Sequence, residues 1–207
     1  MPVKPLHGAK TRLRGAADHG VGDPDVHAAL ALALAHDTVA AVLDARSVRR
    51  LLVVSSDPVV AVEFAVVGVE VTPDVPGGLN AALRHGAALL RARDPMTRVG
   101  AVQADLPALR PEELDEAVAV FGGRGRSFCA DADGTGTTLL LAAGGVALDP
   151  LFGPDSAARH RASGAVALSG AWPGLRRDVD TGEDLCAAAE LGLGPHTRAV
   201  LAPTGRC

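Results

Sequence analysis

The 207-residue chain contains no tyrosine, one tryptophan and four phenylalanines, so its core must be built mainly from aliphatic side chains. Proteins that stack nucleic-acid bases need aromatic side chains, and proteins that follow a phosphate backbone are normally basic. This chain has a formal net charge of −4. We therefore expect no nucleic-acid partner. A small phosphorylated ligand remains compatible with this charge, because it needs only a local cluster of cations.

Cysteine is also scarce, and its spacing shows no CxxC or Cys/His pattern of a metal site. The three cysteines are Cys129, Cys186 and Cys207. We expect them to act as small hydrophobic or incidental thiols. No signal peptide opens the sequence, and we expect no apolar run of about 18 residues that could span a membrane. The apolar stretch 28–35 is bracketed by His27, His36 and Asp37, which favours a core helix in a cytoplasmic protein with no membrane partner.

Hydrophobic residues make up 48% of the chain, which is enough for a sizeable core in one domain. Short apolar runs alternate with helical patterns along the sequence. The expected strands are 51–56, 69–72, 99–104, 126–130, 137–143 and 165–168. The expected helices are 27–44, 61–67, 80–93, 112–121, 154–162 and 181–191. This alternation is typical of an α/β fold with a mostly parallel sheet and helices on both faces.

Asp105 is the most informative acidic residue, because it directly follows the apolar run 99–104. Pro107 cannot donate to a strand ladder, so the strand must end here. In an open α/β sheet, ligands bind at the carboxyl ends of the strands. A carboxylate in that place can hold a divalent metal ion. The alternative is an ordinary capping or turn aspartate.

A basic loop near the N-terminus carries Lys4, Lys10 and Arg12 around Gly8. Such a loop can present cations and free backbone N–H groups to a polyphosphate. It is not a P-loop, because the GxxxxGK[ST] spacing is absent. The alternative is a solvated basic terminus.

Two weaker patterns complete the set of candidate site residues. Gly78 and Asn80 lie in a Pro-Gly-Gly-Leu-Asn turn, where glycine permits close ligand approach and an amide can read a base or ribose. An ordinary helix start is the alternative there. Asp178 and Asp180 are separated by one residue, so they point to the same side of an extended chain. With Asp105 they could hold one or two Mg²⁺ ions, unless Asp180 only caps the next helix and Asp178 pairs with an arginine.

Six stretches occur in the same order in phosphoenolpyruvate/2-phospho-L-lactate guanylyltransferases, a family of deazaflavin coenzyme biosynthesis, which this chain resembles over nearly its whole length. They are VKPLHGAKTRL, GGLNAAL, ADLPAL, GTGTTLL, FGPDSAARHRASGA and DVDTGEDL. The GTGTT and FGPDS stretches are the specific part, whereas the basic loop and Asp-Leu-Pro occur across many nucleotidyltransferases. The resemblance implies the fold of the molybdenum-cofactor nucleotidyltransferases. From the pattern of the second half of the chain, we expect the later β-hairpin and helix to form a lid over the nucleotide-binding half.

The resemblance also implies a role for each matching residue. The residues expected to be catalytic are Lys10, Arg12 and Asp105. Those expected to bind Mg²⁺ are Asp105, Asp178 and Asp180. The residues expected around GTP are Lys4, Gly8, Lys10, Arg12, Gly78 and Asn80. Those expected to hold the three-carbon acid are Thr138, Gly153 and Ser156. Arg159, His160 and Arg161 could add positive charge nearby, with individual roles left open.

The implied reaction transfers GMP from GTP to phosphoenolpyruvate or 2-phospho-L-lactate and releases pyrophosphate. The labile product implies a downstream transferase as a partner. One alternative is another nucleotidyltransferase of the same fold, acting on molybdopterin or a sugar phosphate. A second is a nucleotide-binding module without turnover. A purely structural domain would leave the acidic clusters and the cationic loop unexplained.

The beginning of the chain departs from the family pattern. Only Met1, Pro2 and Val3 precede Lys4, where family members usually have a full hydrophobic strand. We expect either an unusually short first strand or missing residues, with exposed apolar neighbours and a loosened phosphate loop. The chain is otherwise expected to form one domain over 1–207, with a nucleotide-binding half (1–110) and an acceptor-binding and lid half (111–207).

Overall fold

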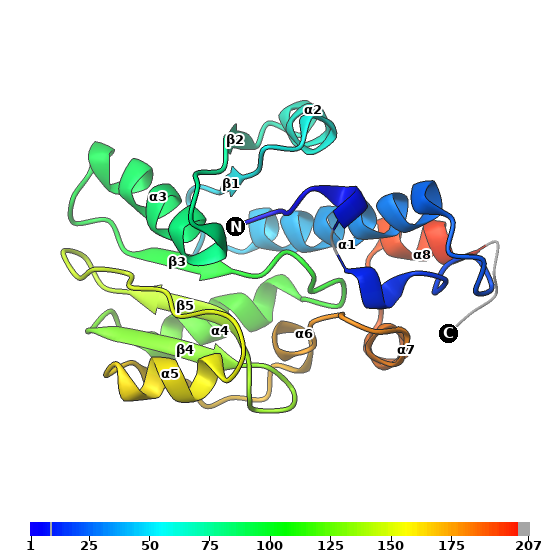
Figure 1. Cartoon of the computed structure of the whole chain (residues 1–207). Helices are drawn as coiled ribbons and strands as arrows, with labels where there is room; N and C mark the ends of the chain where they lie inside the picture. The colour runs from blue at the N-terminus through cyan, green and yellow to red at the C-terminus, as the bar shows by residue number, and fades with distance from the viewer. Residues whose placement is uncertain (9, 203–207) are drawn as a thin grey trace.

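The computed structural model describes residues 1–8 and 10–202 and contains two groups of strands (Figure 1). A parallel pair consists of β1 (Leu52–Val54) and β2 (Glu70–Thr72). A four-stranded sheet has the order β3 (Val99–Val102), β5 (Thr137–Ala142), β4 (Arg126–Ala130) and β6 (Val166–Ala167). The α/β class is confirmed. The sheet is mixed, because β5 runs antiparallel to both of its neighbours while β4 and β6 are parallel.

The helices surround these strands, and many of them begin on a proline, whose missing N–H costs nothing in the first turn. They are α1 (Pro24–Asp44), α2 (Pro58–Val66), α3 (Gly78–Arg93), α4 (Pro111–Phe121), α5 (Ser156–Ala162), α6 (Pro173–Arg176), α7 (Gly182–Leu191) and α8 (Pro195–Leu201). Two short 3-10 turns, η1 (Leu6–Gly8) and η2 (Thr11–Leu13), form the basic loop. The sequence patterns did not predict α6 and α8.

The first strand is reduced to the N-terminal residues, which lie between the two groups of strands in Figure 1. Pro2 pairs in parallel with Val54, and the Val3 N–H donates to the Val54 carbonyl at 3.0 Å. The expected exposure of apolar neighbours is wrong, because Val53 and Val54 are 0% and 2% exposed. The loop that follows is anchored as well, since the Leu6 N–H donates to Oδ2 of Asp57 at 2.9 Å.

Helix α1 is long and apolar enough, by length and composition, to cross a membrane, which corrects the expectation that no such run exists. In the fold, however, 61% of its most apolar window is buried. Leu30 and Leu34 are each only 1% exposed and pack in a cluster with residues of α7 and α8. The expected core helix is therefore confirmed.

The expected lid of hairpin and helix needs a correction. All six residues of β5 are buried, and β5 pairs with both β3 and β4, so the hairpin belongs to the central sheet. A strand buried on both faces must be covered on both sides and cannot swing as a lid. From this region, residues of the hairpin turn 131–136, the first residue of β5, the loop before α5 and the first residue of α5 line the cleft described below. Among the cysteines, Cys129 is buried as expected, and Cys207 lies outside the described residues.

Candidate active site

A cleft of about 690 Å³ opens where the N-terminal loop, the end of β3, the hairpin turn, the loop before α5 and the segment before α7 meet. It brings together most of the predicted site residues from segments far apart in the sequence. These are Lys4, Gly8, Lys10, Arg12, Asp105, Gly153, Ser156, Asp178 and Asp180. The predicted residues that do not line the cleft are Gly78, Asn80 and Thr138.

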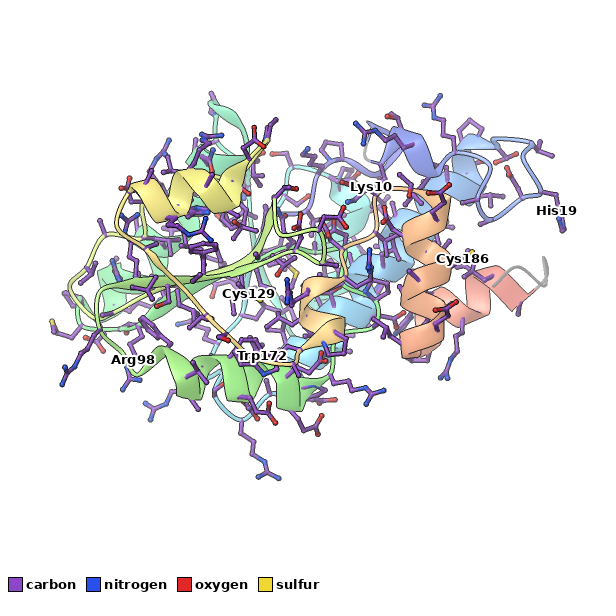
Figure 2. All side chains as sticks on the ribbon, turned by 90° about the horizontal axis from the view of Figure 1, so that it is seen from below. Lys10, His19, Arg98, Cys129, Trp172 and Cys186 are labelled. Carbon is purple, nitrogen blue, oxygen red and sulfur yellow. The ribbon has the colours of Figure 1, made fainter. Side chains whose placement is uncertain are left out.

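The side chain of Lys10 lies between Asp105 and Asp180. Figure 2 shows Lys10 beside α7, the helix that carries Cys186. Its ammonium contacts Oδ2 of Asp105 and lies 2.5 Å from Oδ1 of Asp180. Burial alone would lower the pKa of Lys10, but the charges and hydrogen bonds of these two carboxylates outweigh it and hold that pKa well above its ordinary value. Lys10 is therefore a permanent cation bound between two carboxylates.

Asp178 and Asp180 flank Val179, which is 0% exposed and whose N–H donates to the Asp105 carbonyl at 3.0 Å. This backbone bond ties the late acidic segment to the end of β3, and the alternation of an extended chain turns both aspartates to the cleft. The alternative that Asp180 caps α7 is wrong, because Thr181 is the N-cap and forms a capping box with Asp184. Asp178 makes no ion pair in the described part of the chain, and Arg177 pairs with Asp184 instead.

The acidic cluster carries more negative charge than Lys10 neutralises. Burial, followed by the nearby charges of Asp105 and Asp180, raises the pKa of Asp178 to about 7. Oδ1 of Asp105 is buried and has no hydrogen-bond partner among the described residues. A buried polar atom left in this way is costly. Both observations fit a site that could hold an additional cation.

The carboxylate oxygens here are the ligands that hard divalent cations prefer. In residues 1–8 and 10–202, no three His, Cys, Asp or Glu side chains lie close enough together to hold a metal ion. The ammonium of Lys10 occupies the space between Asp105 and Asp180. All three predicted carboxylates line one cleft, and a cation of the chain itself, the Lys10 ammonium, lies between two of them, Asp105 and Asp180.

Asp131 also lines the cleft, although the sequence analysis gave it no role. Its carboxylate accepts hydrogen bonds from the N–H groups of Thr135 at 2.9 Å and Gly136 at 2.7 Å, so it organises the hairpin turn. A Cβ at Gly136 would lie 2.2 Å from Oδ2 of Asp131, which explains the second glycine of the GTGTT stretch. The available signal was its position directly after a strand, because Asp131 follows β4. Gln103 directly follows β3, also lines the cleft and was also missed.

The loop before α5 forms the other wall of the cleft. Gly153 has φ of 120°, a conformation that favours glycine, and Ser156 is 2% exposed. Thr138 is fully buried away from the cleft, and its neighbour Thr137 lines the cleft instead.

Asn80 uses both groups of its side-chain amide on the backbone of Phe152, at 3.0 and 2.8 Å. A contact between Asn80 and a nucleoside stays a prediction.

The three basic residues of α5 have different surroundings. His160 is 0% exposed, and burial, then Arg126 and Arg159, lower its pKa to about 4. It is neutral near pH 7, so the idea that it adds positive charge is wrong. Arg161 lies over the Phe128 ring at 5.6 Å, and exposed Arg159 is 3.5 Å from the Pro154 carbonyl.

Solved structures share this arrangement of elements. A nucleotidyl transferase from Methanothermobacter is 20% identical with a TM-score of 0.61, covering 92% of this chain and 96% of that protein. A manganese complex of a protein from Mycobacterium tuberculosis H37Rv is 26% identical with a TM-score of 0.52, covering 76% of this chain and 86% of that protein. No protein-family model matches the chain. The chain therefore has the fold of a nucleotidyltransferase.

Curated relatives narrow this class. Phosphoenolpyruvate guanylyltransferase of Geodermatophilus obscurus is 53% identical over 207 residues, which is 100% of this chain and 94% of the relative. The protein of the same name from Streptomyces scabiei is 52% identical over 208 residues, covering 98% of this chain and 94% of the relative. The chain belongs to the phosphoenolpyruvate guanylyltransferase family, as the sequence motifs predict.

Proposed function

We propose that this enzyme transfers GMP from GTP to phosphoenolpyruvate and releases pyrophosphate. The observation that carries the proposal is one cleft lined by Asp105, Asp178 and Asp180, in which Lys10 binds Asp105 and Asp180, and which the loop of Gly153 and Ser156 also lines. The relatives that are 53% and 52% identical bear the name of this activity, which supports the choice of nucleotide and acceptor.

The acceptor phosphate is ionised near pH 7, so no general base is needed. A phosphate oxygen of phosphoenolpyruvate attacks the α-phosphorus of GTP, a new P–O bond forms, and the bond to pyrophosphate breaks. Catalysis then depends on holding two anions together and on neutralising their charge. Lys4 and Arg12, both exposed in the cleft, bind the triphosphate with Gly8, and Lys10 and Arg12 hold the charge of the departing pyrophosphate.

The acidic cluster is the proposed metal site. Asp105, Asp178 and Asp180 are the residues that would hold Mg²⁺, and the manganese in the mycobacterial neighbour supports the use of a divalent cation. When bound, Mg²⁺ supplies Lewis-acid neutralisation of phosphate charge. On the acceptor side, Gly153 and Ser156 hold the carboxylate and phosphate of the three-carbon acid, with Thr137 as the threonine of the cleft wall.

The test is pyrophosphate release with GTP and Mg²⁺ across a panel of acceptors. We expect release with phosphoenolpyruvate, and 2-phospho-L-lactate is the alternative three-carbon acid to compare with it. Release only with molybdopterin or a sugar phosphate would contradict the proposed acceptor class. Calorimetry that shows GTP binding, with no pyrophosphate released for any acceptor, would indicate a binding module without turnover.

The wider setting is proposed on the same basis. The product is a mixed phosphoanhydride, so we expect a downstream transferase of deazaflavin coenzyme biosynthesis to take it directly in the cytoplasm. A product that accumulates unchanged for hours without that transferase would argue against direct transfer. We further propose that residues 1–207 act as one domain, with nucleotide binding in 1–110 and acceptor binding in 111–207.

A further inference from the structure

The acceptor loop, defined here as residues 149–156, is held by a buried histidine that does not line the cleft. Nε2 of His160 accepts the Leu151 N–H at 2.9 Å, and Nδ1 lies 3.0 Å from Oγ1 of Thr137. An imidazole that accepts at Nε2 carries its proton on Nδ1, which then donates to Thr137. Neutral His160 therefore joins the acceptor loop to β5.

Asn80 of α3 holds the next residue of the same loop from another side. Its Nδ2 donates to the Phe152 carbonyl at 3.0 Å, and its Oδ1 accepts the Phe152 N–H at 2.8 Å. The Phe152 ring packs edge-on against His160, with ring centroids 5.2 Å apart. Two consecutive backbone units, Leu151 and Phe152, are thus fixed immediately before Gly153.

The other end of the loop is tied to the hairpin turn. The Ser156 N–H donates to the Gly153 carbonyl at 3.1 Å, and the Ala157 N–H donates to the Thr135 carbonyl at 3.0 Å. The position of Gly153 and Ser156 is therefore set by the groups that hold the backbone on both sides of them. None of these bonds involves the N-terminal loop or the acidic residues.

We propose that His160 and Asn80 are positioning residues for the three-carbon acceptor, acting through the acceptor loop rather than by touching substrate. This inference rests on the proposed function, because it names the group that the loop would hold. A loosened loop lowers acceptor affinity and leaves nucleotide binding intact, since Lys4, Lys10 and Arg12 are held by other elements.

Two substitutions of His160 distinguish the hydrogen bond at Nε2 from the one at Nδ1. His160→Gln keeps an acceptor near the position of Nε2, whereas His160→Asn keeps a group near Nδ1 and leaves the Leu151 N–H without an acceptor. For His160→Asn we expect the KM for phosphoenolpyruvate to rise about tenfold, the effect of one lost hydrogen bond, with the KM for GTP within about twofold. His160→Gln should change the KM for phosphoenolpyruvate by less than about threefold. The control is Ala158→Ser, an exposed position on the same helix that does not line the cleft, which should alter neither KM.

Hydrogen exchange of the loop amides is a readout that does not depend on activity. In His160→Asn the Leu151 amide should exchange at least about tenfold faster than in the wild type. An unchanged exchange rate and an unchanged KM for phosphoenolpyruvate would overturn the proposal. An equal rise in both KM values would also overturn it, because that result indicates a general loss of structure.

Asn80→Asp keeps the proposal testable if His160→Asn does not fold. It retains an acceptor for the Phe152 N–H and removes the donor to the Phe152 carbonyl. We expect the KM for phosphoenolpyruvate to rise while the KM for GTP stays unchanged. A rise in the KM for GTP alone would overturn the assignment of Asn80 and favour nucleoside contact. A wild-type protein without pyrophosphate release contradicts the proposed function, whereas an active wild type with native KM values in both variants contradicts only this inference.

Discussion

Lys10 has a left-handed backbone conformation, with φ of 52° and ψ of 43°, which a non-glycine residue adopts at a cost of about 1 kcal/mol. Such conformations persist where the surrounding structure holds them in place. Here the ammonium of Lys10 is bound by Asp105 and Asp180, and the strained turn brings it from the N-terminal loop into their reach. The conformation and the ion pairs of Lys10 therefore belong to one arrangement, in which the chain supplies the cation that its carboxylates need.

Replacing Lys10 with methionine should make the protein depend on metal for stability. We expect a lower Tm in EDTA, because Asp105, Asp178 and Asp180 then face one another without a cation. Adding Mg²⁺ should raise the Tm of this variant more than that of the wild type. Thermal unfolding with EDTA and then with Mg²⁺ measures both effects. Lys4→Met is the matched control, because Lys4 lines the same cleft but is exposed; equal Mg²⁺ shifts in all three proteins would count against this arrangement.

Gly136 gives a second prediction at this scale. The alanine Cβ would lie 2.2 Å from Oδ2 of Asp131, so Gly136→Ala must displace the carboxylate that organises the hairpin turn. We expect a loss of about 1–3 kcal/mol in the free energy of unfolding, measured by urea denaturation. Gly182→Ala is the control, because nothing lies within 4 Å of its Cβ and it starts a helix. Equal effects of the two substitutions would be inconsistent with the close approach described here.

The helices differ in how much of their formation is encoded locally. Helix α7 carries its own start signal, because Thr181 and Asp184 form a capping box that the sequence predicts. Helix α8 depends instead on Asp37 of α1, whose carboxylate accepts the N–H groups of His196 at 3.0 Å and Thr197 at 2.8 Å. A cap supplied by a distant residue leaves no local pattern. This is why α7 was predicted and α8 was missed.

Thr181→Ala tests the local signal of α7. Losing the side-chain acceptor should cost about 1 kcal/mol in the free energy of unfolding, the usual effect of removing an N-cap. Urea denaturation is the measurement, and Thr181→Ser, which keeps the hydroxyl, is the control. If the serine and alanine variants lose the same stability, the hydroxyl bond to the Asp184 N–H is not what starts the helix.

For the molecule as a whole, stability at low pH depends on groups that bind a proton less readily in the folded protein than in the unfolded chain, and His160 is one of them, together with the buried Met1 amino group. The pKa of His160 is lowered from 6.5 to about 4, mainly by burial, with Arg126 and Arg159 adding to it and Asp149 opposing it. As the pH falls, this histidine binds a proton in the unfolded chain before it does so in the folded protein. The stability that neutral His160 contributes is therefore complete above pH 6.5 and is lost as the pH falls toward 4. Burial also lowers the pKa of His36, so this residue changes stability with pH in the same direction.

We therefore expect stability to fall between pH 6.5 and 4, with His160 accounting for at most roughly 3 kcal/mol of the change. Urea denaturation at several pH values should give a shallower slope for His160→Gln than for the wild type. Asp178, whose pKa is raised, contributes the opposite slope to both proteins, so the difference between them isolates the histidine. Parallel slopes in the two proteins would show that His160 does not set this dependence.

Sequence motifs predicted the α/β class and the family, and most of the site residues that they predicted line the cleft, because each of those signals is local. Asp105 follows an apolar run, Asp178 and Asp180 are separated by one residue, and the basic residues share one loop. The roles of Asn80 and His160 come from hydrogen bonds between segments that the sequence does not place together. The ion pairs of Lys10 with Asp105 and Asp180 could not be predicted either, since those partners lie 95 and 170 residues away.

The most direct test of the acidic cleft is the turnover of Asp105→Asn with GTP, phosphoenolpyruvate and saturating Mg²⁺, read as pyrophosphate release. We expect turnover to fall by about a hundredfold or more, as for the loss of one preorganised electrostatic group. Asp133→Asn, an exposed residue of the hairpin turn, should keep wild-type turnover. Near-wild-type turnover of Asp105→Asn would contradict the role of the carboxylate cluster.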